Sequence, residues 1–324
     1  MNLPNLRGNL KLFAAPLAGV SDTAYRFLAK KYGVDYCFTE MVSSEGLTRN
    51  HARTLDILRR YEGETAVGTQ LFGTRPEVIA DAAQLVEDLG FDSVDLNCGC
   101  PVHKVVNKCG GAALLKDLKL LEAIVTTAAK RISIPFSIKI RSGWSQEKLN
   151  YLEVGKIAEQ SGAAYICIHA RTQTEFFAPE VHLEHIAELK ESISIPVVGN
   201  GGIRRGADAI EMFDKTGCDA VMVASGSLGN PFIFAEIRAL LDGREIPSFT
   251  PAERAATCLE HVTLLTERFG EYRAIKRARK LLGWYYRHIV GRSKVDPSLY
   301  QLSRLAEVED YLGNLVEQVQ GQAA

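Results

Sequence analysis

Two cysteines stand close together in the segment Asn97-Cys98-Gly99-Cys100-Pro101, directly after a short apolar run. A cysteine thiol can donate or accept a proton, or attack as a nucleophile. Cys100 follows a glycine and precedes a proline that fixes the chain direction. Cys100 is therefore the leading candidate for a reacting group, whereas Cys98 is explained by packing alone, because free cysteines are commonly buried.

The same Cys-x-Cys spacing is also compatible with a metal site. A structural zinc ion takes four nitrogen or sulfur ligands at characteristic spacings. Cys109 is poorly placed as a third ligand, and no histidine spacing completes the set. We therefore expect no metal ion.

A lysine and an arginine interrupt the apolar run Ser137-Ile138-Lys139-Ile140-Arg141. Side chains two residues apart on a strand point to the same face, so Lys139 and Arg141 share one face. Burying a lysine is costly unless it meets an anion or a polar ligand. A cation facing a barrel interior would suit an electron-rich ring such as a reduced flavin; the alternative is a solvated lysine on an edge strand.

Other apolar runs end in polar groups. A lone histidine is most often a satisfied core residue, but His169 ends a run two residues before Arg171, which favours a ligand role. Gln70, at the end of another run, is a weak signal by itself. The occurrence of all these groups at strand ends carries the argument for one common site.

Two glycine-containing segments, Asn200-Gly201-Gly202 and Ser225-Gly226, follow two further apolar runs. Glycine lets the backbone approach an anion closely, and the N-terminus of a following helix favours negative charge. We expect these segments to bind a phosphate, with tight turns alone as the alternative explanation.

Eight short apolar runs alternate with amphipathic segments, which predicts a parallel sheet covered by helices. Eight is also the number of strands that closes a (β/α)8 barrel of the TIM type, whose ligand site lies at the carboxyl ends of the strands. A doubly wound open sheet is the alternative. The predicted strands are 12–15, 36–39, 67–71, 94–96, 136–140, 165–169, 196–199 and 220–223.

The alternation stops near residue 241, and the chain is helical from there to residue 319. Thr250-Pro251 with Glu253 has the pattern of a helix start. We therefore predict an α/β barrel domain over 1–243 and an α-helical bundle domain over 250–324.

Composition excludes several classes of protein. The chain has 324 residues, 46% of them hydrophobic and 24% charged, which is too apolar and too balanced in charge for a disordered protein. It lacks an apolar run of about 18 residues, so no membrane span is expected. Seven cysteines and no convincing secretory signal suit a reducing compartment, and we expect a cytoplasmic protein.

The net charge of −1 argues against a uniformly basic nucleic-acid binder. Residues 268–294, however, hold nine Lys and Arg against Glu271 alone, a net +8, so the rest of the chain carries −9. On a helix, apolar residues would take one face. The opposite face would hold Arg273, Lys276, Arg277, Lys280, Arg287 and Trp284, whose indole could stack on a base. We expect RNA contact there, with a solvated charged face as the alternative.

Taken together, the motifs resemble those of the tRNA-dihydrouridine synthase family, in particular its bacterial B-type branch, over nearly the whole chain. The combination of DLNCGCP, a KxR strand and HxRT is specific. The matching segments are APLAGVSD (15–22), TEMV (39–42), QLFG (70–73), DLNCGCP (95–101), NKCGGAALL (107–115), IKIRSGW (138–144), HART (169–172), GNGGI (199–203), GNPFIF (229–234) and ARKLLGWYY (278–286).

The resemblance implies an FMN-binding barrel with a helical RNA-binding domain. Such enzymes reduce uridine in tRNA to dihydrouridine, with NADPH reducing the flavin first and a cysteine, here Cys100, protonating C5. By position, the flavin ring or its neighbouring groups would contact Pro16, Leu17, Gln70, Lys139 and His169, and the flavin phosphate would contact Asn200, Gly201, Gly202, Ser225 and Gly226. The RNA would contact Asn97, Lys104, Arg141 and Arg171, besides the basic residues of 273–287. A monomer is expected.

The chain departs from the family pattern in two places. The family usually has Gly-Arg where this chain has Ala224-Ser225, and HGRT with a Tyr-x-Gly-x-Ala-type segment where this chain has HART followed by QTEFFAPEVHLEH. These changes affect the phosphate site and the loop on the substrate side. Open alternatives are therefore a flavin barrel acting on a free dihydropyrimidine or dihydroorotate, and an RNA-binding member with an altered substrate, such as rRNA, or without activity.

Overall fold

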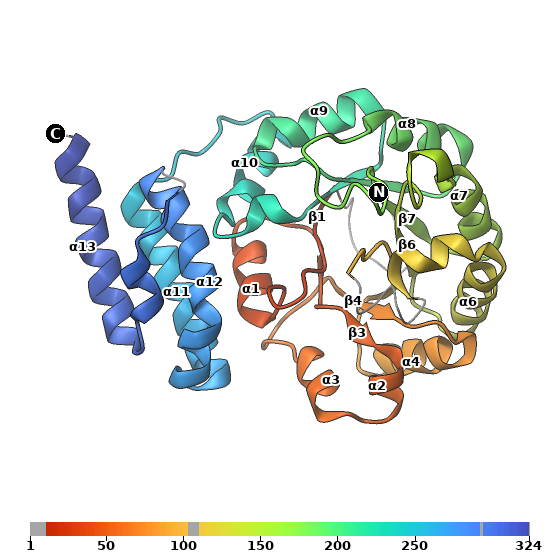
Figure 1. The fold of residues 1–324 in the computed structure, drawn as a ribbon, viewed down its shortest axis with the longest axis horizontal. Helices are drawn as coiled ribbons and strands as arrows, with labels where there is room; N and C mark the ends of the chain where they lie inside the picture. Colours follow the sequence, from red (N-terminus) through yellow and green to blue (C-terminus); the bar gives the residue numbers. More distant parts are fainter. Residues whose placement is uncertain (1–10, 103–109, 292–293, 324) are drawn as a thin grey trace. The chain divides into compact units, whose positions relative to one another are not determined.

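The computed structural model describes residues 11–102, 110–291 and 294–323. The chain forms two compact units, Met1–Ala224 and Ser225–Ala324 (Figure 1). The helix α10 (Phe232–Leu241) is thereby grouped with the second unit. The domain boundary predicted between 243 and 250 stays a prediction.

The first unit is a parallel β-barrel. Its strands are paired in the order β1-β9-β8-β7-β6-β5-β4-β2, and a parallel bridge between Phe13 and Tyr36 joins the first strand to the last. The strands are β1 (Leu12–Ala14), β2 (Cys37–Phe38), β4 (Val67–Phe72), β5 (Ser93–Cys98), β6 (Phe136–Arg141), β7 (Tyr165–His169), β8 (Val197–Asn200) and β9 (Ala220–Val223). The predicted barrel of eight strands is confirmed.

One further strand, β3 (Val42–Ser43), was not predicted. It pairs with the end of β4, where Val42 lies opposite Leu71. Two residues are too short to show the alternation of apolar and polar side chains that identifies a strand.

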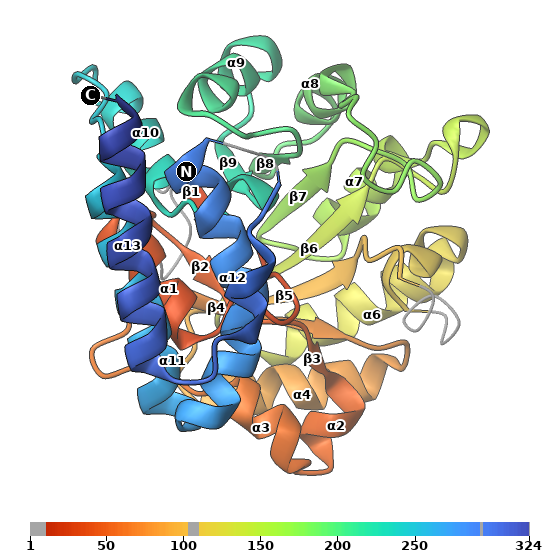
Figure 2. The same cartoon turned by 60° about the vertical axis from the view of Figure 1, so that its left-hand side comes forward.

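Helices lie between successive strands and outside the ring that the strands form (Figures 1 and 2). Their starts follow local chemistry: the Asp22 carboxylate accepts hydrogen bonds from the first amides of α1, and Pro76 occupies the first turn of α4. The helices of this unit are α1 (Thr23–Lys31), α2 (Ser44–Thr48), α3 (Ala52–Ile57), α4 (Pro76–Asp88), α6 (Leu118–Arg131), α7 (Tyr151–Gln160), α8 (Leu183–Ser192) and α9 (Gly206–Thr216), with the 3₁₀ turns η1 (Gly111–Lys116) and η2 (Gln146–Lys148).

A cluster of aromatic and sulfur-containing side chains fills the barrel near the starts of the strands. Phe13, Tyr36 and Tyr165 are fully buried in it, and Tyr165 is the first residue of β7. The ring centroids of Phe13 and Tyr36 are 5.4 Å apart. Because this end of the barrel is packed with side chains, polar chemistry is left to the carboxyl ends of the strands.

The second unit consists of helices. The Thr250 hydroxyl caps α11 by accepting a hydrogen bond from the amide of Glu253, and the Glu253 carboxylate accepts one from the amide of Thr250, as the sequence predicted. The elements are η3 (Ser225–Ser227), α10, α11 (Pro251–Phe269), α12 (Glu271–Val290), η4 (Pro297–Gln301) and α13 (Leu305–Ala323). None of the helices in the described residues combines the length and apolar character that a membrane span requires.

Candidate active site

The strand register places the predicted site residues of the barrel beside one another. Gln70 lies opposite Asp95, and Asn97 lies opposite Lys139. On the next strands Arg141 lies opposite His169, which in turn lies opposite Asn200. Candidates from five neighbouring strands, β4 to β8, therefore form one group at the carboxyl ends.

A chain of hydrogen bonds runs through the interior to the cysteine loop. Oδ1 and Oδ2 of Asp95 accept hydrogen bonds from Ser137 Oγ and Gln70 Nε2, each at 2.7 Å. Gln70 Oε1 accepts one from Asn97 Nδ2 at 2.7 Å. Asn97 Oδ1 accepts one from the backbone amide of Cys100 at 2.9 Å. Because a buried, fully bonded network has one arrangement, it fixes the position of the cysteine loop.

Asp95 was not singled out in the sequence, although it stands two residues before Asn97 and shares its face of the strand. It is 2% exposed, and burial raises the pKa of its carboxyl group to about 7, although hydrogen bonds from Gln70 and Ser137 act in the opposite direction. The same two-residue spacing that linked Lys139 to Arg141 would have revealed Asp95.

Cys100 is partly exposed, whereas Cys98 is buried. Burial raises the pKa of the Cys100 thiol. The positive charge of nearby Arg141 acts in the opposite direction but does not outweigh burial. The thiol therefore stays protonated near neutral pH, which suits a proton donor better than a nucleophile. Burial raises the pKa of Cys98 much further, in line with a packing role.

Lys139 projects from the middle of β6 and donates a hydrogen bond of 2.7 Å from Nζ to Oδ1 of Asn200. The Asn200 amide is held in turn by the backbone carbonyl of Met222, at 2.7 Å. Burial lowers the pKa of Lys139. The predicted pairing of an interior lysine with a polar group is thus present, and the solvated edge-strand alternative is wrong because β6 lies between β5 and β7.

His169 and Arg171 contact each other directly, with 2.8 Å between His169 Nε2 and Arg171 Nη1. Burial, followed by the positive charges of Lys139, Arg141 and Arg171, lowers the pKa of His169 well below its usual value. The imidazole is therefore neutral at physiological pH, and its Nε2 accepts the hydrogen bond from the guanidinium group. Arg171 also donates to the carbonyl groups of Pro179 and Glu180.

Arg141 is 1% exposed, and its guanidinium group donates hydrogen bonds of 2.8 Å to the carbonyl groups of Gly99 and Thr172. Burial and the charge of Arg171 lower the pKa of Arg141 to about 10. Over the residues that the structure describes, Lys139, Arg141 and Arg171 form no ion pair with a carboxylate. The buried Arg141 and Arg171, with the partly buried Lys139 beside them, favour an anionic or electron-rich ligand, although the charges of Asp95 and Glu175 also act on these cations.

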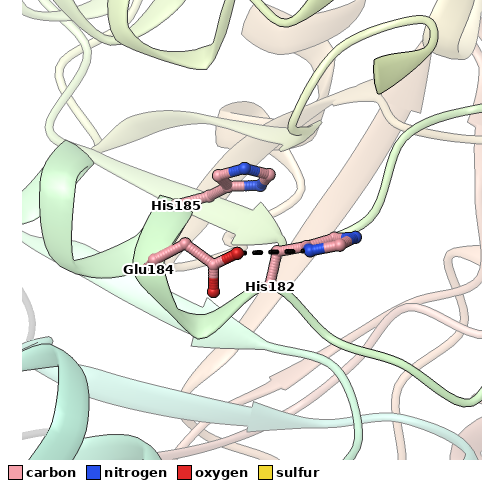
Figure 3. Close-up of side chains that lie close together, drawn as sticks. All are labelled: His182, Glu184 and His185. Carbon is pink, nitrogen blue, oxygen red and sulfur yellow. Dashed lines mark hydrogen bonds and ion pairs between the residues drawn. The ribbon is translucent and has the colours of Figure 1, made fainter.

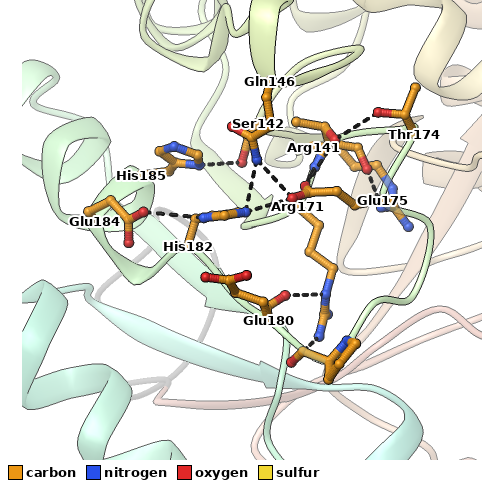
Figure 4. A network of polar contacts seen from close by, with 12 residues as sticks. Arg141, Ser142, Gln146, Arg171, Thr174, Glu175, Glu180, His182, Glu184 and His185 are labelled. Carbon is orange, nitrogen blue, oxygen red and sulfur yellow. Dashed lines mark hydrogen bonds and ion pairs between the residues drawn. The ribbon is translucent and has the colours of Figure 1, made fainter.

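The loop after β7 is held by Glu175 (Figure 4). Its carboxylate accepts hydrogen bonds from Thr172 Oγ1 at 2.9 Å and from Gln146 Nε2 at 2.8 Å, and it lies 2.7 Å from His182 Nε2. Burial would raise the pKa of Glu175, but these hydrogen bonds outweigh it and lower the pKa to about 2. Phe177, 71% exposed, lies on the same loop with its ring centroid 5.6 Å from the Arg141 guanidinium carbon. The sequence argument missed both residues.

The backbone at Gly201 and Gly202 has positive φ angles of 123° and 73°. A Cβ atom at Gly201 would lie 3.0 Å from Cδ2 of His169, and one at Gly202 would lie 2.9 Å from Cγ2 of Val181. Both positions therefore require glycine for conformation and for space. A phosphate at this backbone remains a prediction.

Several other predicted contacts are not decided by the structure. Pro16 has no amide hydrogen, and the Leu17 amide donates a hydrogen bond to Ser21 Oγ at 2.9 Å, so neither amide is available to a ligand. Ser225 and Gly226 form part of η3 in the second unit. Lys104 lies outside the described residues.

Helix α12 has the two faces that the sequence predicted. Its apolar residues Ile275, Ala278, Leu281, Leu282, Tyr285 and Ile289 are buried. Arg273, Lys276, Arg277, Lys280 and Arg287 are exposed, and Trp284 is partly exposed with Lys280 Nζ 4.9 Å from its ring centroid. Tyr272, 71% exposed, adds an aromatic ring that was not predicted.

Comparisons with known proteins identify related sequences. The sequence model described as dihydrouridine synthase (Dus) matches residues 13–322. A protein named tRNA-dihydrouridine synthase B from Shewanella oneidensis is 36% identical over 85% of this chain and 86% of its own. A probable tRNA-dihydrouridine synthase from Rickettsia bellii is 35% identical over 88% of each chain.

Among solved structures, histamine dehydrogenase from Rhizobium sp. 4-9 matches with a TM-score of 0.51 and 13% identity, covering 78% of this chain and 49% of that one. That likeness concerns the fold alone. The match of the family model to almost all of the sequence identifies the relationship. The chain belongs to the dihydrouridine synthase family.

Proposed function

We propose that this protein reduces the C5–C6 double bond of uridine in tRNA, with FMN as its bound cofactor, NADPH as the reductant and Cys100 as the general acid. The observation that carries this proposal is the buried hydrogen-bond chain from Asp95 through Gln70 and Asn97 to the Cys100 amide. It positions the backbone of the loop that carries the protonated Cys100 thiol, within a member of the dihydrouridine synthase family.

The residues at the barrel mouth fit an oxidised or reduced flavin. Lys139 and Arg171 supply positive charge, and His169 adds a neutral hydrogen-bonding ring. Gln70 and the backbone at Pro16 and Leu17 would border the ring. The backbone at Asn200, Gly201 and Gly202 would hold the phosphate, which glycine allows to approach closely. When bound, FMN reduced by NADPH would supply the hydride that adds to C6 of the uracil.

The role of Cys100 follows from chemistry at the neighbouring carbon. When C6 receives a hydride, C5 carries excess electron density and must take up a proton. The Cys100 thiol holds that proton near neutral pH because burial raises its pKa. Asn97 holds the cysteine loop through two backbone amides, those of Gly99 and Cys100, while Arg141 holds the same loop through the Gly99 carbonyl.

A uracil in folded RNA must leave its base stack to reach a barrel mouth, which costs a few kcal/mol. Exposed Phe177, close to Arg141, offers a surface on which an unstacked base can lie. The basic face of α12 would contact the phosphates of the tRNA, and Trp284 and Tyr272 would contact its bases or sugars. We accordingly place the enzyme in the cytoplasm, with its substrate.

The test is to map dihydrouridine in all tRNA and rRNA of wild-type and gene-deletion cells. RNA from the deletion strain is then incubated with the purified protein, FMN and NADPH. We expect a uridine site in tRNA that loses the modification in the deletion strain and regains it in vitro. Unchanged dihydrouridine in every RNA would contradict the proposal. Loss confined to rRNA would favour the altered-substrate alternative, and reduction of free uracil or of a free pyrimidine acid would favour the small-molecule one.

A further inference from the structure

A compact group of potential metal ligands lies at the start of α8, in the first unit (Figure 3). His182, Glu184 and His185 each offer a ligand atom, and these atoms lie within 4.8 Å of one another. His182 Nδ1 and Glu184 Oε1 are 3.3 Å apart. The group falls in the segment where this sequence departs from its family's usual pattern.

That separation is the one expected of two ligands that share an ion. Zinc binds histidine nitrogen and carboxylate oxygen at roughly 2.0–2.2 Å, so two ligands at a tetrahedral angle lie roughly 3.3–3.6 Å apart. The ligand atom of His185 lies within 4.8 Å of the other two.

One ring nitrogen of each histidine is held by side chains outside the group. His182 Nε2 lies 2.7 Å from Glu175 and 2.9 Å from Gln146, and His185 Nδ1 lies 3.0 Å from Ser142 Oγ (Figure 4). These partners leave His182 Nδ1 and His185 Nε2 for a ligand. A carboxylate or hydroxyl group on the outer nitrogen is the usual support of a metal-binding histidine.

The solvent access and the ligand types of this group also fit a metal ion. The Glu184 side chain is 61% exposed and that of His182 is 15% exposed, so an ion can enter from solvent, while His185 is buried beneath them. The ring centroids of the two histidines are 4.9 Å apart. Two imidazoles with one carboxylate suit Zn²⁺ or a similar transition-metal ion, whereas Mg²⁺ and Ca²⁺ prefer sites made of oxygen ligands.

We propose that His182 Nδ1, the Glu184 carboxylate and His185 Nε2 bind one divalent transition-metal ion of the zinc class, with water in the remaining position. The sequence prediction of no metal considered histidines only as partners of the cysteine pair. The ion would replace the proton that His182 Nδ1 shares with Glu184 in the metal-free protein.

Binding there would stiffen the loop on the substrate side. The amide of His182 donates a hydrogen bond of 3.0 Å to the carbonyl of Ala170, and Glu175 joins His182 to Thr172. The same loop supplies the carbonyl groups of Pro179 and Glu180 to Arg171. An ion at His182 would therefore tie α8 to the segment that holds Arg171, without taking part in the reduction.

The experiment uses full-length protein stripped of metal with EDTA and titrated separately with Zn²⁺ and Co²⁺. Calorimetry gives the stoichiometry and affinity, and the visible spectrum of bound Co²⁺ reports its coordination. Glu184→Gln and His182→Gln remove ligands, and Glu175→Gln removes a supporting carboxylate. Glu191→Gln, exposed on the same helix, and His51→Gln, exposed in another loop, are the matched controls.

We expect one Zn²⁺ per chain and a Co²⁺ spectrum without thiolate charge-transfer bands. Glu184→Gln and His182→Gln should weaken binding by more than tenfold, and Glu175→Gln by about 10–100-fold, as for other supporting residues. Both controls should bind as the wild type does. Absence of saturable binding, thiolate bands from the cysteines, or unchanged affinity in Glu184→Gln would overturn the proposal. Because Glu184 is largely exposed, that variant tests the site without disturbing the fold.

Discussion

The backbone amide of Cys100 donates a hydrogen bond of 2.9 Å to Oδ1 of Asn97. The other end of the Asn97 side chain donates to Gln70 Oε1 at 2.7 Å and contacts Met41 Sδ at 3.0 Å. All the polar atoms of this amide are thus engaged within the protein. In this arrangement Asn97 positions the cysteine loop. For Asn97 to contact uracil as predicted, one of these hydrogen bonds would have to break and be replaced by a bond to the uracil.

Replacing Asn97 by alanine should lower kcat with little change in KM for tRNA. The Cys100 amide loses its acceptor, and a displacement of a reacting group by about 1 Å can cost on the order of a hundredfold in rate. Steady-state kinetics with tRNA measure kcat and KM separately. Gln84→Ala is the control, because it removes side-chain hydrogen bonds to Glu87 and Asp88 on helix α4, outside the hydrogen-bond chain that ends at Cys100. A raised KM with unchanged kcat would show that Asn97 binds substrate instead.

Asp95 should contribute stability at low pH that is lost as the pH rises from about 4 to about 7. Its pKa in the folded protein is raised to about 7, above the value of about 3.9 in an unfolded chain, so the folded state holds the proton over this interval. The contribution is complete below about pH 4 and is lost as the pH passes about 7, amounting to a few kcal/mol.

Denaturation by urea at a series of pH values measures this dependence. Between about pH 4 and about pH 7 the free energy of unfolding of Asp95→Asn should rise relative to that of the wild type, because the variant lacks the contribution that the wild type loses. Asp88→Asn, on the far end of α4, should keep the wild-type slope. Identical slopes in wild type and Asp95→Asn would show that the carboxyl group titrates normally.

Arg26 and Glu64 form a fully buried ion pair, with 2.6 Å between Arg26 Nε and Glu64 Oε1. Glu64→Gln should lower the free energy of unfolding by about 3–5 kcal/mol, because it leaves the guanidinium charge buried without its partner. Arg49→Ala breaks an exposed pair with Glu45 and should cost less than about 1 kcal/mol. If thermal or urea denaturation gave similar losses in the free energy of unfolding for the two variants, burial of the Arg26–Glu64 pair would not explain its effect on stability.

The basic face of α12 should control how tRNA binding depends on salt. Each phosphate contact removed, as in Arg273→Ala or Lys280→Ala, should weaken binding and reduce the slope of log affinity against log salt by about one. Lys215→Ala, which removes an exposed lysine from α9, should leave the slope unchanged. Filter binding at several salt concentrations gives the slopes, and equal slopes in all variants would exclude this face as an RNA contact.

Much of the fold can be predicted from the sequence, because the barrel strands are apolar on both faces and end at turn residues. The runs at 165–169 and 220–223 match β7 and β9 residue for residue. The two-residue strand β3 has no such pattern, since it depends on its pairing with β4. The two faces of α12 were predictable because a 20-residue helix shows its periodicity clearly.

The individual residues of the candidate site were largely predictable, whereas the hydrogen bonds and contacts that join them were less so. Lys139, His169 and Cys100 stood out because polar groups at the ends of apolar strands need an explanation. Asp95 was overlooked because an acid beside the more conspicuous Asn97 and Cys98 gives no separate signal. The group of His182, Glu184 and His185 depends on how the loop after β7 folds back on Gln146 and Ser142, which no local pattern reveals.

The most direct test of the central claim is the rate at which Cys100→Ala forms dihydrouridine in tRNA, measured in a single turnover with the flavin reduced beforehand. We expect this variant to bind FMN as the wild type does and to form dihydrouridine about 10²–10⁴-fold more slowly, the usual contribution of a general acid. Cys98→Ala, which removes the neighbouring buried thiol, should keep a rate near that of the wild type. Dihydrouridine formation by Cys100→Ala at the wild-type rate would contradict the assignment of Cys100 as the proton donor.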